Sequence, residues 1–418
     1  MLYFDHAATS WPKPREVPRA MLSAMTEAGG NPGRSGHLLS VRAAELVYGT
    51  RELAAEFFHA PGPENVLFYP NATYALNAVF KGLLSPGAPL GVPRGTPTGT
   101  VCSAGRNGKG RETDGIGGAG CVHVLCSGME HNAVVRPLYA MREQGVITET
   151  FPVFRDADGM LTEEEILSGI RSRIRKNTVL LCACHASNVC GAVLPIGKIG
   201  RLCRERGIAF VTDASQSAGV RDIDMERDCI DYLCTAGHKA LLGPQGSGLL
   251  IVGADAKCPV SFVQGGNGVQ SLSPEMPDFL PEALEAGTLS TPAIAGLGAG
   301  IRTVMRVGTE EIRGQSAALC ARLAEILGNT DGIKLFQSRL PPAAVLSFTV
   351  RGRSCNETAA FFADHGICTR AGFHCAPLPH RAFGTEKTGT VRVSVGWGNR
   401  MREAEAFHAV LRELLRQA

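Results

Sequence analysis

The stretch RAGFHCAP, residues 370–377, holds a cysteine where a thiol could act as a reagent. It is too polar and too broken to form part of a hydrophobic core. Cys375 directly follows His374 and lies near Arg370, and positive charge on those two side chains would favour the reactive thiolate. The alternative is that Cys375 is a small packing residue, like most of the chain's fourteen cysteines.

A lysine in the segment TAGHKALLGPQGSG is a second candidate. Lys239 lies between an apolar strand, DYLCTA, and a tight glycine-proline loop, which is a poor position for a merely solvated charge. Desolvation lowers the pKa of an amine, and a neutral amine is the form that condenses with an aldehyde. Lys239 is therefore a candidate for covalent attachment of an aldehyde ligand.

Further polar residues stand where apolar strands end. Asp213 ends IAFVTD and needs a cationic or hydrogen-bonding partner, and Gln216 stands three residues later. Asn188 follows TVLLCAC, and His131 opens the helix after VHVLC. A satisfied structural aspartate is the alternative for Asp213, but the strand end favours a functional site.

These residues need a scaffold that brings the strand ends together. From about residue 65 to 255, short apolar strands alternate with helical stretches such as ATYALNAVFKGLL and IGKIGRLCRERG. That alternation predicts an α/β fold with a mostly parallel central sheet wrapped by helices on both faces. Ligands of such sheets bind beyond the carboxyl ends of the strands.

One ligand would use all of these groups. After NVLFY, Ala72 and Thr73 begin a helix, where backbone N–H groups and a hydroxyl stabilise a phosphate, although an ordinary N-cap is the alternative. Pyridoxal 5'-phosphate needs a phosphate cradle, a carboxylate for its ring nitrogen, partners for its ring hydroxyl, a flat group against its ring and a lysine for its aldehyde. We predict this cofactor and no metal, since CACHASNVC lacks a second C-x-x-C pair.

The bulk composition bounds the remaining choices. A chain of 418 residues, 44% hydrophobic and 19% charged, predicts a globular protein with two domains. A net charge of +3 indicates neither a nucleic-acid nor a membrane partner, and no apolar run approaches a membrane span. A cytoplasmic protein is expected. Residues 91–120 contain ten glycines and no aromatic residue, which predicts a flexible insertion.

At this point the chain resembles a known family, the class V branch of fold type I pyridoxal-phosphate enzymes, and within it the cysteine desulfurase and selenocysteine lyase group. The resemblance is carried by YFDHAATSWPKP, SNVCG, DASQSAG, GHKALLGPQGSG, EAGTLSTP and RAGFHCAP. It implies a large cofactor domain at residues 16–296, with the insertion at 91–120. A small α+β domain of residues 1–15 and 297–418 would carry the cysteine loop.

The resemblance also implies a role for each site residue. Lys239, Cys375 and His131 are the expected catalytic residues, and Arg370, Arg392 and Asn188 the expected substrate-binding residues. For Arg392, a strand arginine that faces solvent is the alternative. The residues expected to bind the cofactor are Ala72, Thr73, His131, Asn188, Asp213, Gln216, His238, Lys239 and, across a homodimer interface, Thr288.

The implied reaction converts L-cysteine to L-alanine and leaves the sulfur on Cys375 as a persulfide. A sulfur-acceptor protein, for example in iron–sulfur cluster assembly, would then take the sulfur. Two alternatives stay open: a selenocysteine lyase, aminotransferase or racemase with no persulfide step, and a non-catalytic sulfur-carrier dimer. The chain departs from the family pattern at His6, Gly33, Ala236 and Phe373, which leaves the exact substrate open.

Overall fold

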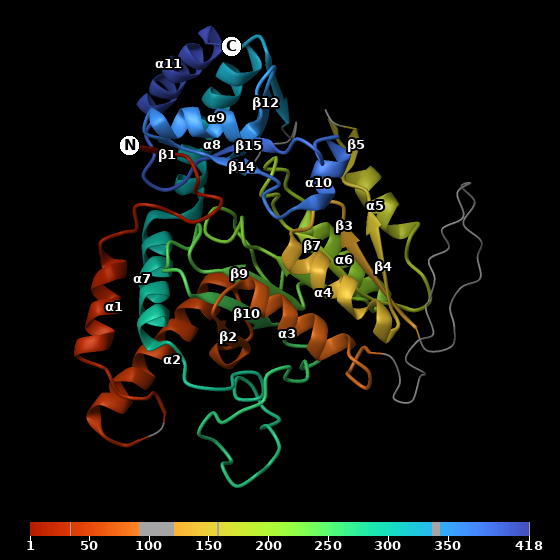
Figure 1. The fold of residues 1–418 in the computed structure, drawn as a ribbon. Helices are drawn as coiled ribbons and strands as arrows, with labels where there is room; N and C mark the ends of the chain where they lie inside the picture. The colour runs from red at the N-terminus through yellow and green to blue at the C-terminus, as the bar shows by residue number, and fades with distance from the viewer. Residues whose placement is uncertain (34, 92–120, 157–158, 337–342, 418) are drawn as a thin grey trace.

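Two β-sheets organise the protein (Figure 1). The structure is a computed structural model that describes residues 1–33, 35–91, 121–156, 159–336 and 343–417. The insertion expected at residues 91–120 lies, apart from Gly91, outside the described residues.

The larger sheet has seven strands in the order β2-β10-β9-β8-β7-β3-β4, and only β10 runs antiparallel to its neighbours. The mostly parallel sheet and its six predicted strands are confirmed. The strand β4 was not predicted, because its middle residues are only partly buried and form no apolar run. The strands are β2 (Val66–Tyr69), β3 (Val122–Ser127), β4 (Val146–Phe151), β7 (Thr178–Cys184), β8 (Ala209–Asp213), β9 (Tyr232–Ala236) and β10 (Gly248–Val252).

Helices cover both faces of this sheet. Alternate strand residues point to opposite faces, so Leu125 joins one core cluster while Val124 and Cys126 join the other. The helices α3 (Ala72–Leu84) and α4 (Asn132–Ala140) pack on one face. On the other face lie α2 (Leu38–Phe58), α5 (Glu163–Arg171), α6 (Ile196–Arg206) and α7 (Thr291–Val307), with α1 (Glu16–Thr26) packed against α7.

The smaller sheet is antiparallel, in the order β11-β12-β15-β14. A separate core holds helices against it, with Phe348, Phe362 and Phe407 fully buried. Its strands are β11 (Ile333–Phe336), β12 (Val345–Val350), β14 (Arg370–Gly372) and β15 (Thr390–Ser394). Its helices are α8 (Thr309–Gly328), α9 (Cys355–Asp364) and α11 (Arg402–Arg416).

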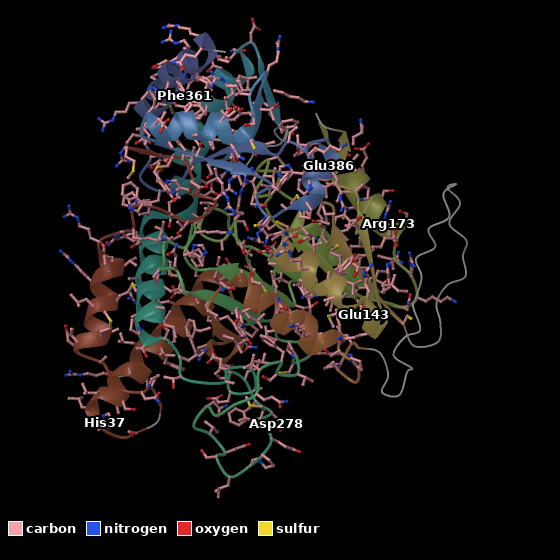
Figure 2. All side chains as sticks on the ribbon, viewed as in Figure 1. His37, Glu143, Arg173, Asp278, Phe361 and Glu386 are labelled. Carbon is pink, nitrogen blue, oxygen red and sulfur yellow. The ribbon has the colours of Figure 1, made fainter. Side chains whose placement is uncertain are left out.

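Shorter elements connect these parts. The first strand, β1 (Leu2–Tyr3), pairs in parallel with β13 (Ile367–Cys368), so both chain ends lie beside the smaller sheet (Figure 1). The segment from 253 to 290 contains no helix or strand and projects from the larger sheet, with Asp278 on its outer part (Figure 2). The remaining elements are η1 (Pro63–Asn65), η2 (Met141–Gln144), β5 (Phe154–Asp156), β6 (Gly159–Met160) and α10 (Pro377–Ala382).

Among the helices that the structure describes, none has both the length and the apolar character needed to cross a bilayer.

Candidate active site

One cavity collects the polar residues that the sequence places at successive strand ends. It lies where β2, β3, β7, β8 and β9 give way to loops or helices, which is the expected edge of a parallel sheet. Asn71, Ala133, Cys184, Ser215 and Ala236 also line it. The predicted site residues that it brings together are Ala72, Thr73, His131, Asn188, Asp213, Gln216, His238 and Lys239.

The start of α3 forms one wall of this cavity. Asn71 caps the helix, because its Oδ1 accepts a hydrogen bond of 3.1 Å from the Tyr74 N–H. Thr73, which also lines the cavity, is therefore not the N-cap. A Cβ at Gly248 would lie 2.7 Å from the Asn71 carbonyl carbon, so only glycine lets β10 approach here. The positive end of the α3 dipole consequently faces the cavity and favours an anion.

Asp213 and Lys239 form the charged centre of the cavity. Asp213 is buried, and its Oδ1 accepts hydrogen bonds from the Ser215 backbone at 2.9 Å and the Ser215 hydroxyl at 2.5 Å. Burial lowers the pKa of the Lys239 amine, and the opposing charge of Asp213 offsets only part of this effect. The neutral amine is thus favoured relative to an exposed lysine.

Two histidines of the cavity are neutral at physiological pH. Burial lowers the pKa of His131 to about 4, although Asp213 opposes the change. The Nδ1 of His131 accepts a hydrogen bond of 3.0 Å from the Ala133 N–H, so its proton resides on Nε2. Burial also lowers the pKa of His238 to about 4, and its buried Nδ1 has no partner among the described residues.

The two amide side chains of the cavity contact backbone carbonyls. The resemblance implies that Gln216 and Asn188 hold a ring oxygen. In the structure, Gln216 Nε2 donates to the Ala7 carbonyl at 2.9 Å, and Asn188 Nδ2 donates to the His374 carbonyl at 2.6 Å. The buried Asn188 Oδ1 has no partner within the described part of the chain and is left to a ligand.

The cysteine loop is attached to the cavity without lining it. Cys375 is exposed and is not among the lining residues, yet Asn188 holds the preceding carbonyl and the Asn132 N–H donates to the Cys375 carbonyl at 2.7 Å. His374 and Cys375 both adopt left-handed conformations, with φ of 50° and 55°. Such a pair is costly for non-glycine residues and persists because these bonds fix it.

The expectation that His374 supplies positive charge is wrong. The ring is buried, its Nε2 lies 3.0 Å from the Thr390 hydroxyl, and burial together with Arg392 lowers its pKa to about 2. A neutral His374 leaves the cationic role to arginines. Arg370 and Arg392 are direct neighbours on β14 and β15, and Arg392 interacts electrostatically with Cys375.

Arg392 is buried, so the alternative of a solvent-facing arginine is wrong. Its guanidinium, 1% exposed, donates to Asp5 Oδ1 at 2.7 Å and to the Asn188 carbonyl at 3.2 Å. Sequence reasoning missed Asp5, because it lies 387 positions away and only the motif YFDHAATS singles it out. Thr288, by contrast, is exposed and is not among the residues that line the cavity.

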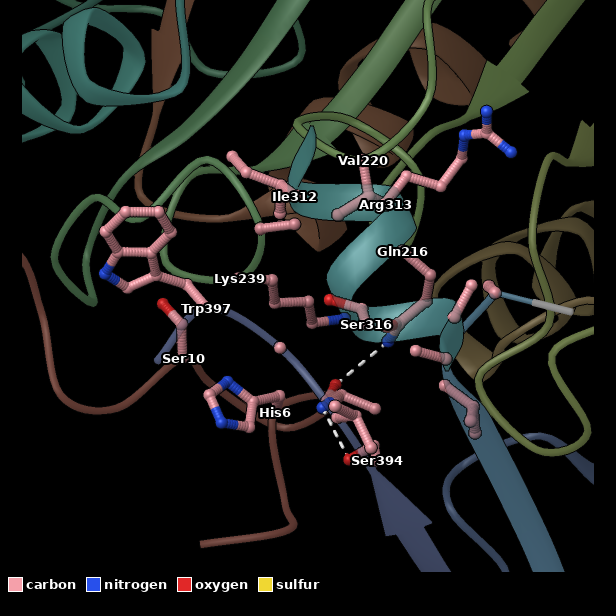
Figure 3. A pocket seen from close by; sticks show the side chains of 18 of the residues that line it. His6, Ser10, Gln216, Val220, Lys239, Ile312, Arg313, Ser316, Ser394 and Trp397 are labelled. Atoms are coloured by element: carbon pink, nitrogen blue, oxygen red, sulfur yellow. Dashed lines mark hydrogen bonds between the residues drawn. The ribbon is translucent and has the colours of Figure 1, made fainter. Parts of the chain in front are cut away.

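A second cavity adjoins the first. Lys239 and Gln216 line both cavities. Figure 3 shows these two side chains in the second cavity. His6 is buried in the second cavity, its pKa lowered to about 4 by burial, and neither ring nitrogen has a partner among the residues described. Its other lining residues include Ser10, Leu242, Ile312, Ser316 and Trp397.

Comparison with known proteins identifies relatives over the whole chain. A probable cysteine desulfurase from Xylella fastidiosa (strain 9a5c) is 31% identical over 414 residues, which cover 98% of this chain and 90% of that protein. Another from Methanothermobacter thermautotrophicus is 29% identical over 420 residues, covering 99% and 94%. The apo structure of the cysteine desulfurase from Thermococcus onnurineus NA1 superposes with a TM-score of 0.83 at 26% identity, covering 100% of this chain and 95% of that one.

A family model agrees with these relatives. The model described as aminotransferase class-V matches residues 2–90 and 121–407, which include both sheets, the cavity and the cysteine loop. This match covers most of the chain and includes the strand ends that line the cavity and the lysine after β9. The chain therefore belongs to the class-V aminotransferase family.

Proposed function

We propose that this protein is a pyridoxal 5'-phosphate-dependent cysteine desulfurase that converts L-cysteine to L-alanine and retains the sulfur on Cys375. The observation that carries the proposal is the link between the lysine cavity and the thiol loop, because Asn188 lines the cavity and holds the His374 carbonyl. The names of the full-length relatives agree with it.

The residues of the cavity fit the cofactor. A buried carboxylate, a neutral ring and a helix N-terminus suit a cationic ring nitrogen, a flat ring and a phosphate, and two buried polar atoms, Asn188 Oδ1 and His238 Nδ1, still lack partners among the described residues. Lys239 would hold the aldehyde, Asp213 the ring nitrogen, and residues 72 and 73 with His238 the phosphate. When bound, the cofactor supplies an electron sink for a carbanion at the substrate Cα.

The protein's own groups then bind the substrate and move protons. Arg392 keeps its buried Nε without a partner in the described structure, and this donor suits the substrate carboxylate beside Arg370. The Lys239 amine, whose pKa is lowered by burial, accepts the proton from the substrate Cα. The neutral His131 keeps that face of the cavity free of a competing cation.

The sulfur step balances without an added oxidant. The Cys375 thiolate attacks the sulfur of bound L-cysteine, so a sulfur–sulfur bond forms while the carbon–sulfur bond of the substrate breaks. The electron pair of the broken bond and a proton stay with the three-carbon product, which leaves as L-alanine. Arg370 and Arg392, neighbours on β14 and β15, supply positive charge to this end of the site.

Further parts of the proposal concern the assembly. We infer a homodimer in which the exposed Thr288 reaches the cofactor phosphate of the partner subunit. We also infer a large domain of residues 16–296 and a small domain of residues 1–15 and 297–418. A cytoplasmic location and a sulfur-acceptor protein, as in iron–sulfur cluster assembly, complete the proposal.

Incubation with L-cysteine followed by mass analysis of the Cys375 peptide tests the proposal. We expect a gain of one sulfur atom on that peptide and one L-alanine for each sulfur transferred. Alanine without a sulfur gain, or turnover of selenocysteine alone, would favour the lyase reading. Purified protein with no visible cofactor band would favour the non-catalytic sulfur carrier.

A further inference from the structure

The carbonyl of His238 accepts an unusual number of hydrogen bonds. The hydroxyl of Thr9 donates to it at 3.1 Å, Ser10 donates from its backbone at 3.1 Å and its hydroxyl at 3.2 Å, and Lys13 Nζ donates at 2.6 Å. This carbonyl belongs to the peptide bond that leads into Lys239. Three residues near the start of the chain therefore fix the backbone from which the reactive amine extends.

Lys13 differs from the other two donors because it brings a charge. It is half-buried, its ammonium also donates to the Ser10 hydroxyl at 2.7 Å, and no carboxylate pairs with it in the described part of the chain. Burial lowers its pKa to about 8, so most of the charge is retained at neutral pH. That charge helps to lower the pKa values of His6 and His238.

The segment around Lys13 is anchored at two further points. Asp5 pairs with Arg392, and the Ala7 carbonyl accepts the Gln216 amide. The stretch from residue 5 to residue 13 thus contacts an expected substrate-binding residue, an expected cofactor-binding residue and the peptide before Lys239. Residues 5–13 are therefore held against the candidate active site at three points.

We propose that Lys13 is a positioning residue for Lys239: its ammonium fixes the His238–Lys239 peptide and places a positive charge at the His238 carbonyl, one peptide bond before the lysine. The inference rests on the proposed function, in which Lys239 carries the cofactor. Asp213, Arg392, Cys184 and Arg370 act electrostatically on Lys239, and none of them is changed when Lys13 is replaced. The Lys13 ammonium is held at the carbonyl of the peptide that leads into Lys239, where it opposes a second positive charge, so its loss raises the proton affinity of the nitrogen at position 239.

The test compares Lys13→Met, Lys13→Gln and Lys13→Arg with the control Lys257→Met. Lys257 is a matched control, because it is also a lysine that donates to a backbone carbonyl, that of Pro89 at 3.2 Å. It is exposed and follows β10, whose antiparallel direction places it at the edge of the larger sheet opposite the cavity. Each cofactor-loaded protein is titrated from pH 6 to 10 while its visible absorption is recorded, and thermal unfolding is measured in parallel. The absorption reports protonation of the lysine-bound nitrogen without any need for turnover.

We expect the midpoint of the Met and Gln variants to move upward by about half a pH unit or more. The control should keep the wild-type midpoint, and the Arg variant, whose charge persists throughout the titration, should stay at or below it. Equal midpoints in wild type and the Met variant would overturn the inference. If the Met variant is insoluble, the Gln variant, which keeps a donor but no charge, decides the question. A wild-type protein with no visible absorption band would instead refute the proposed function. The failure of the Lys13 inference and the failure of the proposed function can therefore be told apart.

Discussion

At the scale of single residues, burial sets the protonation of the ionisable groups around the cavity. It lowers the pKa of His131 and His238 to about 4 and, with Arg392, that of His374 to about 2. The imidazoles are therefore hydrogen-bonding and packing groups at neutral pH. In the proposed function, positive charge beside the substrate is assigned to Arg370 and Arg392, because guanidinium groups stay charged even when buried.

Replacement of the reactive thiol is the most direct residue-level prediction. Cys375→Ser should abolish sulfur transfer from L-cysteine, because a hydroxyl cannot hold a persulfide, while the visible cofactor band and the unfolding temperature stay unchanged. Sulfide release and the mass of the residue 370–377 peptide measure the effect. Cys258→Ser is the matched control, since Cys258 is also exposed, and it should react like wild type. Full sulfur transfer by Cys375→Ser would contradict the assignment.

Glu130 gives a prediction with a defined pH dependence. Its carboxylate lies buried behind the cavity, where Oε1 accepts the Cys184 N–H at 2.7 Å, and burial together with Asp213 raises its pKa from 4.5 to about 8. The folded state therefore keeps a proton that the unfolded state loses above pH 4.5, and stability falls as pH rises from 4.5 to about 8. Glu130→Gln should remove this loss, about 1.4 kcal/mol for each pH unit.

Urea unfolding of both proteins at pH 5, 6, 7 and 8 checks this prediction. The free energy of unfolding of Glu130→Gln should exceed that of wild type by an amount that grows with pH. A difference that stays constant over this range would show that Glu130 is ionised in the folded state.

At the scale of elements, the start of α4 serves two parts of the site. His131 caps the helix with its ring and lines the cavity, while the N–H of the next residue, Asn132, holds the Cys375 carbonyl. A helix leaves its first N–H groups without internal partners, so they can bind another segment at no cost to the helix. The cysteine loop thus uses donors that α4 itself cannot use.

Asn132→Pro tests this docking. Proline is favoured at the first helical position and His131 is already extended, with ψ of 158°, so α4 should persist and the free energy of unfolding should change by only about 1 kcal/mol. The N–H that holds the Cys375 carbonyl is lost, and iodoacetamide should therefore alkylate Cys375 faster than in wild type. Asn132→Ala keeps the N–H and should react at the wild-type rate. Equal rates in all three proteins would mean that this bond does not restrain the thiol.

At the scale of the whole molecule, the sequence predicts local features well and distant contacts poorly. The strand ends were predictable, because an apolar run that stops at Asp213 or before Asn188 marks both a strand and an edge of the sheet. The roles of Asp5 and Lys13 were not, since their partners Arg392 and His238 lie 387 and 225 positions away and no periodicity encodes such pairs. The burial of His374 could not be predicted from the sequence either, which is why this side chain was expected to be a cation.

The buried pair of Arg51 and Glu285 gives a prediction about overall stability. Arg51 of α2 pairs with Glu285, which also accepts the Phe68 N–H at 2.6 Å, so the pair joins a helix, the edge strand β2 and the projecting segment. Arg51→Met leaves the carboxylate buried without its cation and should lower the free energy of unfolding by about 3–5 kcal/mol in a urea titration.

An exposed ion pair provides the comparison. Arg322 contacts Glu405 at 2.8 Å on the surface, and Arg322→Met should lower the free energy of unfolding far less than Arg51→Met, because solvent screens the exposed pair. A similar cost for both variants would mean that Glu285 takes up a proton and needs no cation.

The cavity on the far side of Lys239 and Gln216 offers a route to selective inhibitors (Figure 3). The indole of Trp397, the aliphatic side chains of Leu242 and Ile312 and the neutral ring of His6 line this cavity. They suit a small aromatic compound that carries one hydrogen-bond donor. Such a compound would contact Lys239 from the cavity opposite the proposed coenzyme site. It would therefore not need to displace a vitamin-derived coenzyme that many unrelated enzymes share.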